Sequence, residues 1–374
     1  MKKKILFISG TRADFGKLKP LIRKIQNSDH FEYAIFATGM HMLAKYGSTF
    51  IEIRKSGFSN IYPYINQDGA LNNPMDMVLA NTIQGLAHYI REHSADMIVV
   101  HGDRIEAMAG AIVGALGNTL VAHIEGGEVS GTVDELIRHS ITKLSHVHFV
   151  SNDEARQRLI QMGELPSTVY IIGSPDIDVM LSDDLPAINE VLAYYEIPFS
   201  DYAIFTYHPV TTELPLLRDN IRQLIIAIRE SELNYVVIYP NSDTGAEIIL
   251  EELEQLKGDA RFRLLPSMRF EYYLSLLRNA RMIVGNSSAG IREAPVYGVP
   301  TINIGTRQMN RFKYMSIFDT PTDKEKISMA IKSCPSVSPV SLHFGHGTSA
   351  KLFMEILETE NLWGTPKQKQ FCDL

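Results

Sequence analysis

Short runs of apolar residues alternate with longer amphipathic segments along most of the chain. In the first half, segments such as "MDMVLANTIQGLAHYIREHS" and "DEARQRLIQMG" have their apolar residues at helical spacing. The apolar runs between such segments are "ILFISG", "YAIFATG", "DMIVVHGD", "TLVAHIEGG", "VHFVSN" and "VYIIGSP". Strands buried on both faces of a parallel sheet read as continuous apolar runs. This alternation therefore predicts an α/β protein with a doubly wound parallel sheet.

The alternation pauses at "GSPDIDVMLSDDLPA", where Pro and Asp residues are concentrated between 175 and 186. It then restarts with "YAIFTYHP", "YVVIYPNSD", "FRLLP", "RMIVGNSS" and "PTINIG". A chain of 374 residues is long enough for two domains of roughly 100–200 residues each. We therefore predict a second α/β domain after this boundary.

Ligands of open α/β sheets bind outside the carboxyl ends of the strands. This rule selects the polar segments that directly follow each predicted strand, and two facing sheets would bring them together across a central cleft. The segments are "GTRADFGK", "GDRIEA", "EGGEVSGTVDE", "HPVTTE", "PNSDTG", "GNSSAGIREA" and "GTRQ".

Composition excludes several classes of protein. The formal net charge of −7 argues against nucleic acid as the main partner, so any anion site must be local. Cys334 and Cys372 are too few for a disulfide framework or a cysteine-rich zinc site, which fits a reducing cytoplasm. The opening "MKKKILFISGTRADFG" has too short an apolar core for a signal peptide, and no stretch is long enough to cross a membrane.

The first candidate anion site is "GTRADFGK", which is close to a P-loop. It has one residue too many between its glycines, and Leu18 stands where a P-loop has a magnesium-binding Ser or Thr. ATP hydrolysis of the Walker type is therefore not expected. Backbone N–H groups at a helix start, with Arg12 and Lys17, still suit a phosphate, although an ordinary surface loop fits the spacing equally well.

The second candidate is "GNSSAGIREA", where Asn286, Ser287 and Ser288 stand between a predicted strand and a helix. Hydroxyls and N–H groups at a helix start bind anions, whereas simple N-capping would need only one of these residues. Glu293 lies one turn further on and could accept hydrogen bonds from ribose hydroxyls. His208, which follows "AIFTY", suits either a phosphate contact or a structural role.

Structural or capping roles explain several other histidines and acids. His146 and His148 in "SHVHFV" alternate on one strand and are read as structural, and His343 with His346 is a weak metal pair because no carboxylate or cysteine stands nearby. The Asp-x-Asp spacing in "PDID" occurs at metal sites of some glycosyltransferases. At a domain boundary before a helix, capping explains these aspartates better.

The segment "HIEGGEVSGTVDELIRHS" contains four carboxylates before its first basic residue, Arg138. A turn with a helix N-cap explains some of them but not all four. Asp103 in "HGDRIEA" ends another predicted strand, where it suits an N-cap, a titratable group beside a ligand, or both.

Taken together and in this order, "GTRADFGKLKP", "HGDRIEA", "HIEGGEVSGTVDELIRHSITKLSH", "HPVTTE", "GNSSAGIREAPVYGVP" and "INIGTRQ" closely resemble the hydrolysing UDP-N-acetylglucosamine 2-epimerases of sialic acid biosynthesis. The resemblance covers almost the whole chain. It implies a GT-B-like fold with two Rossmann-like domains that face a central cleft. We expect residues 1–177 to form the domain of the sugar and the catalytic acids, completed by a C-terminal helix at about 360–374, and residues 178–359 to form the UDP-binding domain.

The resemblance also implies the reaction. UDP is eliminated across C1–C2 of the sugar to give 2-acetamidoglucal, and hydration then releases N-acetylmannosamine. Carboxylates suit the proton transfers and the positive charge that develops at C1. Asp103, Glu125 and Asp134 match the family's three catalytic acids, which leaves Glu128 and Glu135 as structural or supporting groups.

The resemblance carries the nucleotide contacts over to a set of polar residues in both predicted domains. Arginines can neutralise a diphosphate, so neither a metal nor a cofactor is expected. Relatives often carry Ser at position 16, where this chain has Gly16. The expected contacts are Arg12, Asp14, Lys17, Arg104, His208, Asn241, Ser287, Ser288, Glu293 and Arg307.

Three alternatives remain open at this point, one of which, a non-catalytic nucleotide-sugar sensor, is disfavoured by the three acids because buried carboxylates near a diphosphate would weaken binding. Non-hydrolysing relatives usually carry an Arg after an "EAG" motif, and "EGGEVSGT" in its place favours the hydrolysing branch. A hydrolysing 2-epimerase of UDP-N,N′-diacetylbacillosamine shares these motifs, and a GT-B glycosyltransferase shares the fold. The expected protein is a cytoplasmic enzyme that binds a UDP-sugar, contacts neither nucleic acid nor membrane, and forms a homodimer or homotetramer.

Overall fold

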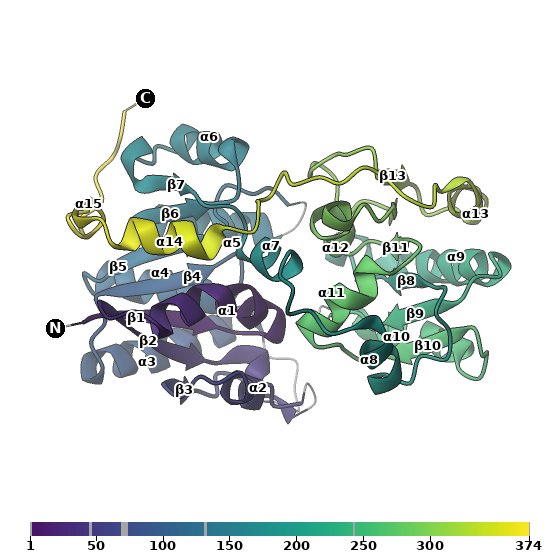
Figure 1. Cartoon of the computed structure of the whole chain (residues 1–374), viewed down its shortest axis with the longest axis horizontal. Helices are drawn as coiled ribbons and strands as arrows, with labels where there is room; N and C mark the ends of the chain where they lie inside the picture. Colours follow the sequence, from purple (N-terminus) through teal and green to yellow (C-terminus); the bar gives the residue numbers. More distant parts are fainter. Residues whose placement is uncertain (1, 45–46, 69–73, 131–132, 242–243, 374) are drawn as a thin grey trace. The chain divides into compact units, whose positions relative to one another are not determined.

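The computed structural model describes residues 2–44, 47–68, 74–130, 133–241 and 244–373. The chain divides into two compact units, residues 1–182 with 343–374 and residues 183–342. Each unit is an α/β domain built on a parallel sheet, as the alternation of apolar runs predicts (Figure 1). The GT-B-like fold class, with two Rossmann-like domains, is thereby confirmed. No helix among the described residues is long and apolar enough to span a membrane.

Within its described residues, the first unit has seven parallel strands in the order β3-β2-β1-β4-β5-β6-β7. The inner strands are fully buried because helices cover both faces, so Ile5 and Phe7 of β1 contribute to one hydrophobic core and Leu6 and Ile8 to the other. The strands are β1 (Lys3–Ser9), β2 (Phe31–Ala37), β3 (Ile61–Pro63), β4 (Met97–His101), β5 (Leu120–Ile124), β6 (Val147–Val150) and β7 (Val169–Ile171).

The helices of the first unit connect these strands or return to them from the end of the chain. In Figure 1, α14 (yellow) runs beside α1 (purple). The α-helices are α1 (Arg12–Gln26), α2 (Phe50–Lys55), α3 (Met75–Glu92), α4 (Ile105–Leu116), α5 (Val133–Leu144), α6 (Asp153–Gln161), α7 (Pro175–Met180), α14 (Ser349–Leu357) and α15 (Glu360–Trp363).

The described part of the second unit has six parallel strands in the order β10-β9-β8-β11-β12-β13. The strands are β8 (Ala203–Thr206), β9 (Tyr235–Ile238), β10 (Phe262–Leu265), β11 (Ile283–Gly285), β12 (Thr301–Ile304) and β13 (Ile317–Thr320). The α-helices are α8 (Ile188–Tyr194), α9 (Leu217–Glu230), α10 (Ala246–Leu253), α11 (Phe270–Arg278), α12 (Ala289–Arg292) and α13 (Lys324–Ser333).

The domain boundaries differ from those expected from the sequence. The chain leaves the first unit after residue 182 rather than 177, and it returns at 343 rather than at about 360. The early return follows from contacts of α14, because Asp178 accepts hydrogen bonds from the Ser349 and Ala350 N–H groups at 2.8 and 2.7 Å. The expected helix at about 360–374 is also wrong, since α15 ends at Trp363 and the described residues after it are not helical.

Candidate active site

The candidate residues of the first unit begin where β1 turns into α1. Thr11 caps α1, accepting from the Asp14 N–H at 3.1 Å, so the helix begins at Arg12. The glycine turn is therefore confined to Gly10, while Gly16 and Lys17 lie within the helix rather than in a phosphate-binding loop. The Asp14 carboxylate is held by the Gly10 N–H at 3.0 Å and by His101 Nδ1 at 2.9 Å.

The end of β4 carries His101, Gly102 and Asp103, and a histidine of the next strand fixes this turn. His123 Nε2 donates to the Gly102 carbonyl at 2.8 Å, and Gly102 has a φ of +69°, which favours glycine. Burial lowers the pKa of His123 to about 3, so its ring is neutral and acts as a fixed donor. The fold thus holds the backbone beside Asp103 in one conformation.

Glu125 directly follows β5 and is the most constrained of the predicted acids. Its φ is +61°, an uncommon conformation for a residue with a side chain, and its surface is only 5% exposed. Ser174 Oγ donates to Oε1, while Oε2 lies 3.2 Å from His101 Nε2 and 3.8 Å from Lys17 Nζ. Backbone strain of this kind, held by surrounding contacts, is typical of functional sites.

Asp103 pairs with a cation from α5. Arg138 Nη2 donates to the Asp103 carboxylate, and the Arg138 side chain is 8% exposed. Arg104 is the N-cap residue of α4, so Asp103 does not fill the capping role considered from the sequence. Asp134 lies in the first turn of α5, four residues before Arg138 and therefore on the same helix face. Arg138 therefore connects α5, which carries Asp134, to the turn that carries Asp103.

Arg104 and Arg12 stand at the same sheet edge. Arg104 Nε donates to Glu106 at 3.1 Å, and Glu106 is almost fully buried against two glycines. A Cβ atom at Gly10 would lie 2.8 Å from the Glu106 carboxyl carbon, and one at Gly39 would lie 2.4 Å from its Oε1. The fold therefore requires glycine at both positions to accommodate this carboxylate.

The other two acids of the segment "HIEGGEVSGTVDELIRHS" are held within the fold. Glu128 accepts a hydrogen bond from Ser151 Oγ, and Glu135 accepts from the Ser130 N–H at 2.9 Å. These contacts fit the structural roles expected for both residues.

A separate group of candidate residues lies at the ends of β8 and β11 in the other unit. The side chain of Asn286 clasps the backbone of His208, accepting from its N–H at 2.7 Å and donating to its carbonyl at 2.8 Å. The Asn241 N–H donates to His208 Nδ1 at 3.0 Å. Burial, with the charge of Arg307 adding to it, lowers the pKa of His208 to about 3. The ring is therefore neutral and carries its proton on Nε2, which makes Nε2 a fixed hydrogen-bond donor.

The turn after β11 brings Ser287 and Ser288 to the same sheet end. Gly285 has a φ of +135°, and a Cβ there would lie 1.9 Å from the Thr206 carbonyl oxygen. The following helix α12 has only four residues, so its dipole is weak, and the hydroxyls and N–H groups are the features that would suit an anion.

Arg307 and Glu293 complete the predicted residues of the second unit. Arg307 Nη1 donates to the Asn286 carbonyl at 3.3 Å, and Gln308 Nε2 donates to the same oxygen at 2.8 Å. Glu293 is 7% exposed at the end of α12, where its charge adds to burial in raising the pKa of Tyr273. His208, Asn241, Asn286 and Arg307 are thus linked by hydrogen bonds at one end of this sheet.

The described residues show no metal centre. No group of three His, Cys, Asp or Glu side chains is placed to hold a metal within the described ranges. The aspartates of "PDID" have separate partners, since Asp176 lies 2.9 Å from Lys17 Nζ and Asp178 caps α14. His343 Nε2 lies 2.9 Å from Asn152 Nδ2. Independence from metal stays a prediction.

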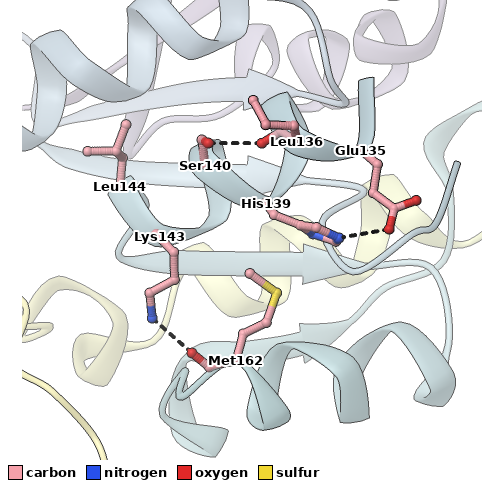
Figure 2. Close-up of a pocket in the computed structure, with 7 residues that line it drawn as sticks. All are labelled: Glu135, Leu136, His139, Ser140, Lys143, Leu144 and Met162. Carbon is pink, nitrogen blue, oxygen red and sulfur yellow. Dashed lines mark hydrogen bonds and ion pairs between the residues drawn. The ribbon is translucent and has the colours of Figure 1, made fainter. Parts of the chain in front are cut away.

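An open hollow on the surface of α5 is separate from these residues. Figure 2 shows Lys143 reaching the Met162 carbonyl at 3.0 Å and His139 facing Glu135. Its lining contains none of the predicted catalytic or nucleotide-binding residues. We therefore place the candidate site at the strand ends and not in this hollow.

Sequence reasoning missed three residues that organise the candidate site: His101, Glu106 and Arg138. Each stands within or beside a quoted motif, so its position along the chain was visible. Their roles could not be predicted from local patterns, because the residues that they contact are distant along the chain. His101, for example, contacts Asp14, which is 87 positions away. Only the parallel pairing of β1, β4 and β5 reveals these contacts.

Comparisons with known proteins identify relatives of this chain. The family model described as UDP-N-acetylglucosamine 2-epimerase matches residues 23–358. A UDP-N-acetylglucosamine 2-epimerase of Neisseria meningitidis serogroup B is 48% identical over 377 residues, covering 100% of this chain and 99% of the relative. The hydrolysing UDP-N,N′-diacetylbacillosamine 2-epimerase of Legionella pneumophila is 30% identical and covers 96% of each chain.

Two further similarities extend this picture. The polysialic acid biosynthesis protein P7 of Escherichia coli is 33% identical and covers 88% of this chain and 85% of the relative. Among solved structures, the Methanocaldococcus jannaschii UDP-GlcNAc 2-epimerase in complex with UDP-GlcNAc and UDP matches with a TM-score of 0.80. That match is 21% identical and covers 95% of this chain and 99% of the other, so it supports the fold. The chain belongs to the UDP-N-acetylglucosamine 2-epimerase family.

Proposed function

We propose that this chain is a hydrolysing 2-epimerase that converts UDP-N-acetylglucosamine and water into N-acetylmannosamine and UDP. The observation that carries the proposal is the set of acids at one sheet end. Glu125 is held by Ser174, His101 and Lys17, and Asp103 is held by Arg138. Family membership, the name of the Neisseria relative and the polysialic acid relative support the substrate and the branch.

The reaction begins with elimination. A carboxylate takes the proton from C2 of the sugar, the C1–O bond breaks, and UDP leaves with the electron pair of that bond. We assign the C2 proton to Asp103, whose pairing with Arg138 favours the ionised form that a base requires. Glu125, a buried and fixed anion next to cationic groups, stabilises the positive charge that develops at C1.

Hydration completes the reaction. Water adds its hydroxyl to C1 of 2-acetamidoglucal and a proton is delivered to C2 on the opposite face, which gives the manno configuration. We assign proton transfer with this water to Asp134, which is partly exposed in the first turn of α5. Free N-acetylmannosamine then leaves.

In this proposal the second unit recognises the nucleotide. His208 Nε2, Ser287, Ser288 and Arg307 donate to phosphate oxygens, and Glu293 accepts from ribose hydroxyls. Arg12 and Arg104 of the first unit add positive charge for the diphosphate, so the reaction needs no metal. Lys17 and Asp14, expected among the nucleotide contacts, are bonded to acids and to His101 in this structure and are reassigned to positioning roles.

The first experiment compares two nucleotide sugars. Release of UDP should be fast with UDP-N-acetylglucosamine and much slower with UDP-N,N′-diacetylbacillosamine. The reverse preference would select the activity named for the Legionella relative. If UDP appeared only after an acceptor sugar was added, the protein would be a glycosyltransferase and the proposal would be wrong.

A further inference from the structure

His101 is a buried titratable residue for which the proposed reaction has no assigned step. It is the last residue of β4, and its side chain is 10% exposed. Its two ring nitrogens face two carboxylates, Nδ1 lying 2.9 Å from Asp14 Oδ1 and Nε2 lying 3.2 Å from Glu125 Oε2. The three side chains thus form a carboxylate–imidazole–carboxylate line at the sheet end.

We propose that His101 is a positioning residue for the catalytic acid Glu125, acting at neutral pH as an imidazolium that fixes Glu125 in place as an anion. The inference rests on the proposed function, because it explains how Glu125 is prepared for the charge at C1. A neutral imidazole carries one N–H and can donate to only one carboxylate, whereas the imidazolium donates from both nitrogens. His101 Nδ1 is hydrogen-bonded to Asp14, and Nε2 lies at ion-pair distance from Glu125 without the angle of a hydrogen bond. A carboxylate on each side of the ring therefore favours the charged imidazolium.

The surrounding charges favour the same state. The other charged and titratable groups near this line include Lys17 on α1, His41, His123 on β5, Asp176 on α7 and the Asp103–Arg138 pair two residues along the chain. Burial by itself would lower the pKa of His101, but Glu125 and Asp14 outweigh it and raise the pKa to about 9. Below this pH the ring is charged, and the charge is lost as pH rises through it.

Asp14 has a supporting part in this arrangement. Its other carboxylate oxygen is fixed by the Gly10 N–H at 3.0 Å, and its backbone N–H is fixed by Thr11. The imidazolium is therefore anchored to the first turn of α1 on one side and presents Nε2 to Glu125 on the other. Ser174 and Lys17 take up the remaining directions around Glu125.

The test combines a spectroscopic and a kinetic measurement on the full chain. In protein labelled with ¹⁵N-histidine, the His101 signals, identified by their loss in His101→Gln, should show both ring nitrogens protonated at pH 7.5 and titrate near pH 9. In wild type, kcat should decrease as pH rises through the same value, which gives the pH profile a basic limb. His101→Gln should lower kcat at pH 7.5 by roughly 10²-fold, change KM little and abolish the limb.

Two matched variants keep the test decisive. Asp14→Asn retains His101 but removes one carboxylate, so the ¹⁵N titration and the kcat limb should both move to lower pH. His146→Gln changes a buried histidine next to the neighbouring strand β6. Burial lowers the pKa of His146, so this variant should leave the limb unchanged.

A His101 ring with a single protonated nitrogen at pH 7.5, or a limb that survives His101→Gln, would overturn the inference. Absence of turnover in wild type would instead refute the proposed function, while the ¹⁵N titration would still decide the state of His101.

Discussion

His101 and His208 occupy comparable places in the two units, at or just after the end of a central strand, yet their protonation states are opposite. Both rings are buried, and burial favours the neutral form of each. Two carboxylates face His101 and raise its pKa to about 9, whereas Arg307 and a backbone N–H leave His208 neutral with a pKa of about 3. The partners rather than the degree of burial decide the charge.

The same contrast holds for the two sheet ends as a whole. The end in the first unit is composed of paired charges, with Asp14, His101, Asp103 and Glu125 each meeting an opposite charge. The end in the second unit is composed mainly of neutral donors fixed by the Asn286 clasp. Charged groups suit proton transfer and the stabilisation of a cationic centre, while fixed neutral donors suit recognition of an anion. The contrast supports the proposal that the first unit carries out the chemistry and the second recognises the nucleotide.

The largest effect should come from removing charge at the end of the first sheet. Asp103→Asn or Glu125→Gln keeps the shape of the side chain but removes the carboxylate, so kcat should fall by roughly 10²–10⁴-fold while UDP affinity changes little. Steady-state kinetics and calorimetric UDP titration measure the two quantities. The control is Glu128→Gln, which alters an acid bonded to Ser151 and should retain near-parental turnover. Equal losses at Glu128 and Glu125 would show that the acids are wrongly assigned.

A smaller but still large effect should follow from altering the backbone of the second sheet end. Gly285→Ala places a Cβ 1.9 Å from the Thr206 oxygen, and it should lower the free energy of unfolding by about 3–4 kcal/mol. Gly258→Ala is a matched control in the same unit, since Gly258 also has a positive φ of +87° but no atom within 4 Å of the added Cβ. Its cost should be about 1–2 kcal/mol. Similar values from urea unfolding of the two variants would contradict the steric explanation.

Much of this fold was predictable from local patterns, and the exceptions have a physical cause. All eleven apolar runs quoted from the sequence are strands in the structure. The two strands missed were β3 and β13, which are the outer strands of their sheets and are only partly buried, so they lack a continuous apolar run. The return at residue 343 was missed because the capping of α14 by Asp178 joins residues 171 positions apart.

The site was predictable in its residue types but not in its pairings. The rule that ligands bind outside the carboxyl ends of the strands selected the four turns that hold Asp103, Glu125, His208 and Ser287. It did not show that Lys17 pairs with Asp176 rather than standing in a phosphate loop, because α1 and α7 meet only in the folded chain. These pairings are fixed by tertiary contacts, which local sequence patterns do not show.

The next prediction concerns nucleotide binding. His208→Ala removes the fixed Nε2 donor and should weaken UDP binding by about 10–100-fold, or about 1.4–2.8 kcal/mol. Because His208 is neutral down to a pH of about 3, its contribution should stay constant between pH 5 and 8. Calorimetry across this pH range measures both. Unchanged UDP affinity in His208→Ala would contradict the assignment of nucleotide recognition to this sheet end.

A modest effect is expected at the opposite end of α5, far along the helix from Asp134. Lys369 Nζ donates to the Thr142, Lys143 and Ser145 carbonyls at 2.6–3.2 Å and pairs with buried Glu164. Lys369→Met should therefore lower the free energy of unfolding by about 1–3 kcal/mol. Lys367→Met is the control, because the hydrogen bond between Lys367 and His146 runs through the Lys367 backbone carbonyl, which the substitution retains.

The effect of Lys369→Met should depend on pH in a defined direction. Burial would raise the pKa of Glu164, but the hydrogen bond from His148 and the charge of Lys369 outweigh it and lower the pKa to about 2. The stabilisation is therefore present above the ordinary pKa of 4.5 and is lost as pH falls toward 2. Urea unfolding at pH 7 and pH 3 should show a smaller difference between wild type and Lys369→Met at the lower pH. An equal difference at both would exclude Glu164 as the partner.

The most direct test of the proposed chemistry is the reaction with UDP-N-acetylglucosamine in deuterated water, followed by proton NMR. Elimination and hydration exchange the C2 proton and invert its configuration, so the account predicts free N-acetylmannosamine that carries deuterium at C2 from the first turnovers. UDP should appear in equal amount. A product that still carries UDP, or free sugar that keeps its C2 proton in the gluco configuration, would contradict the account.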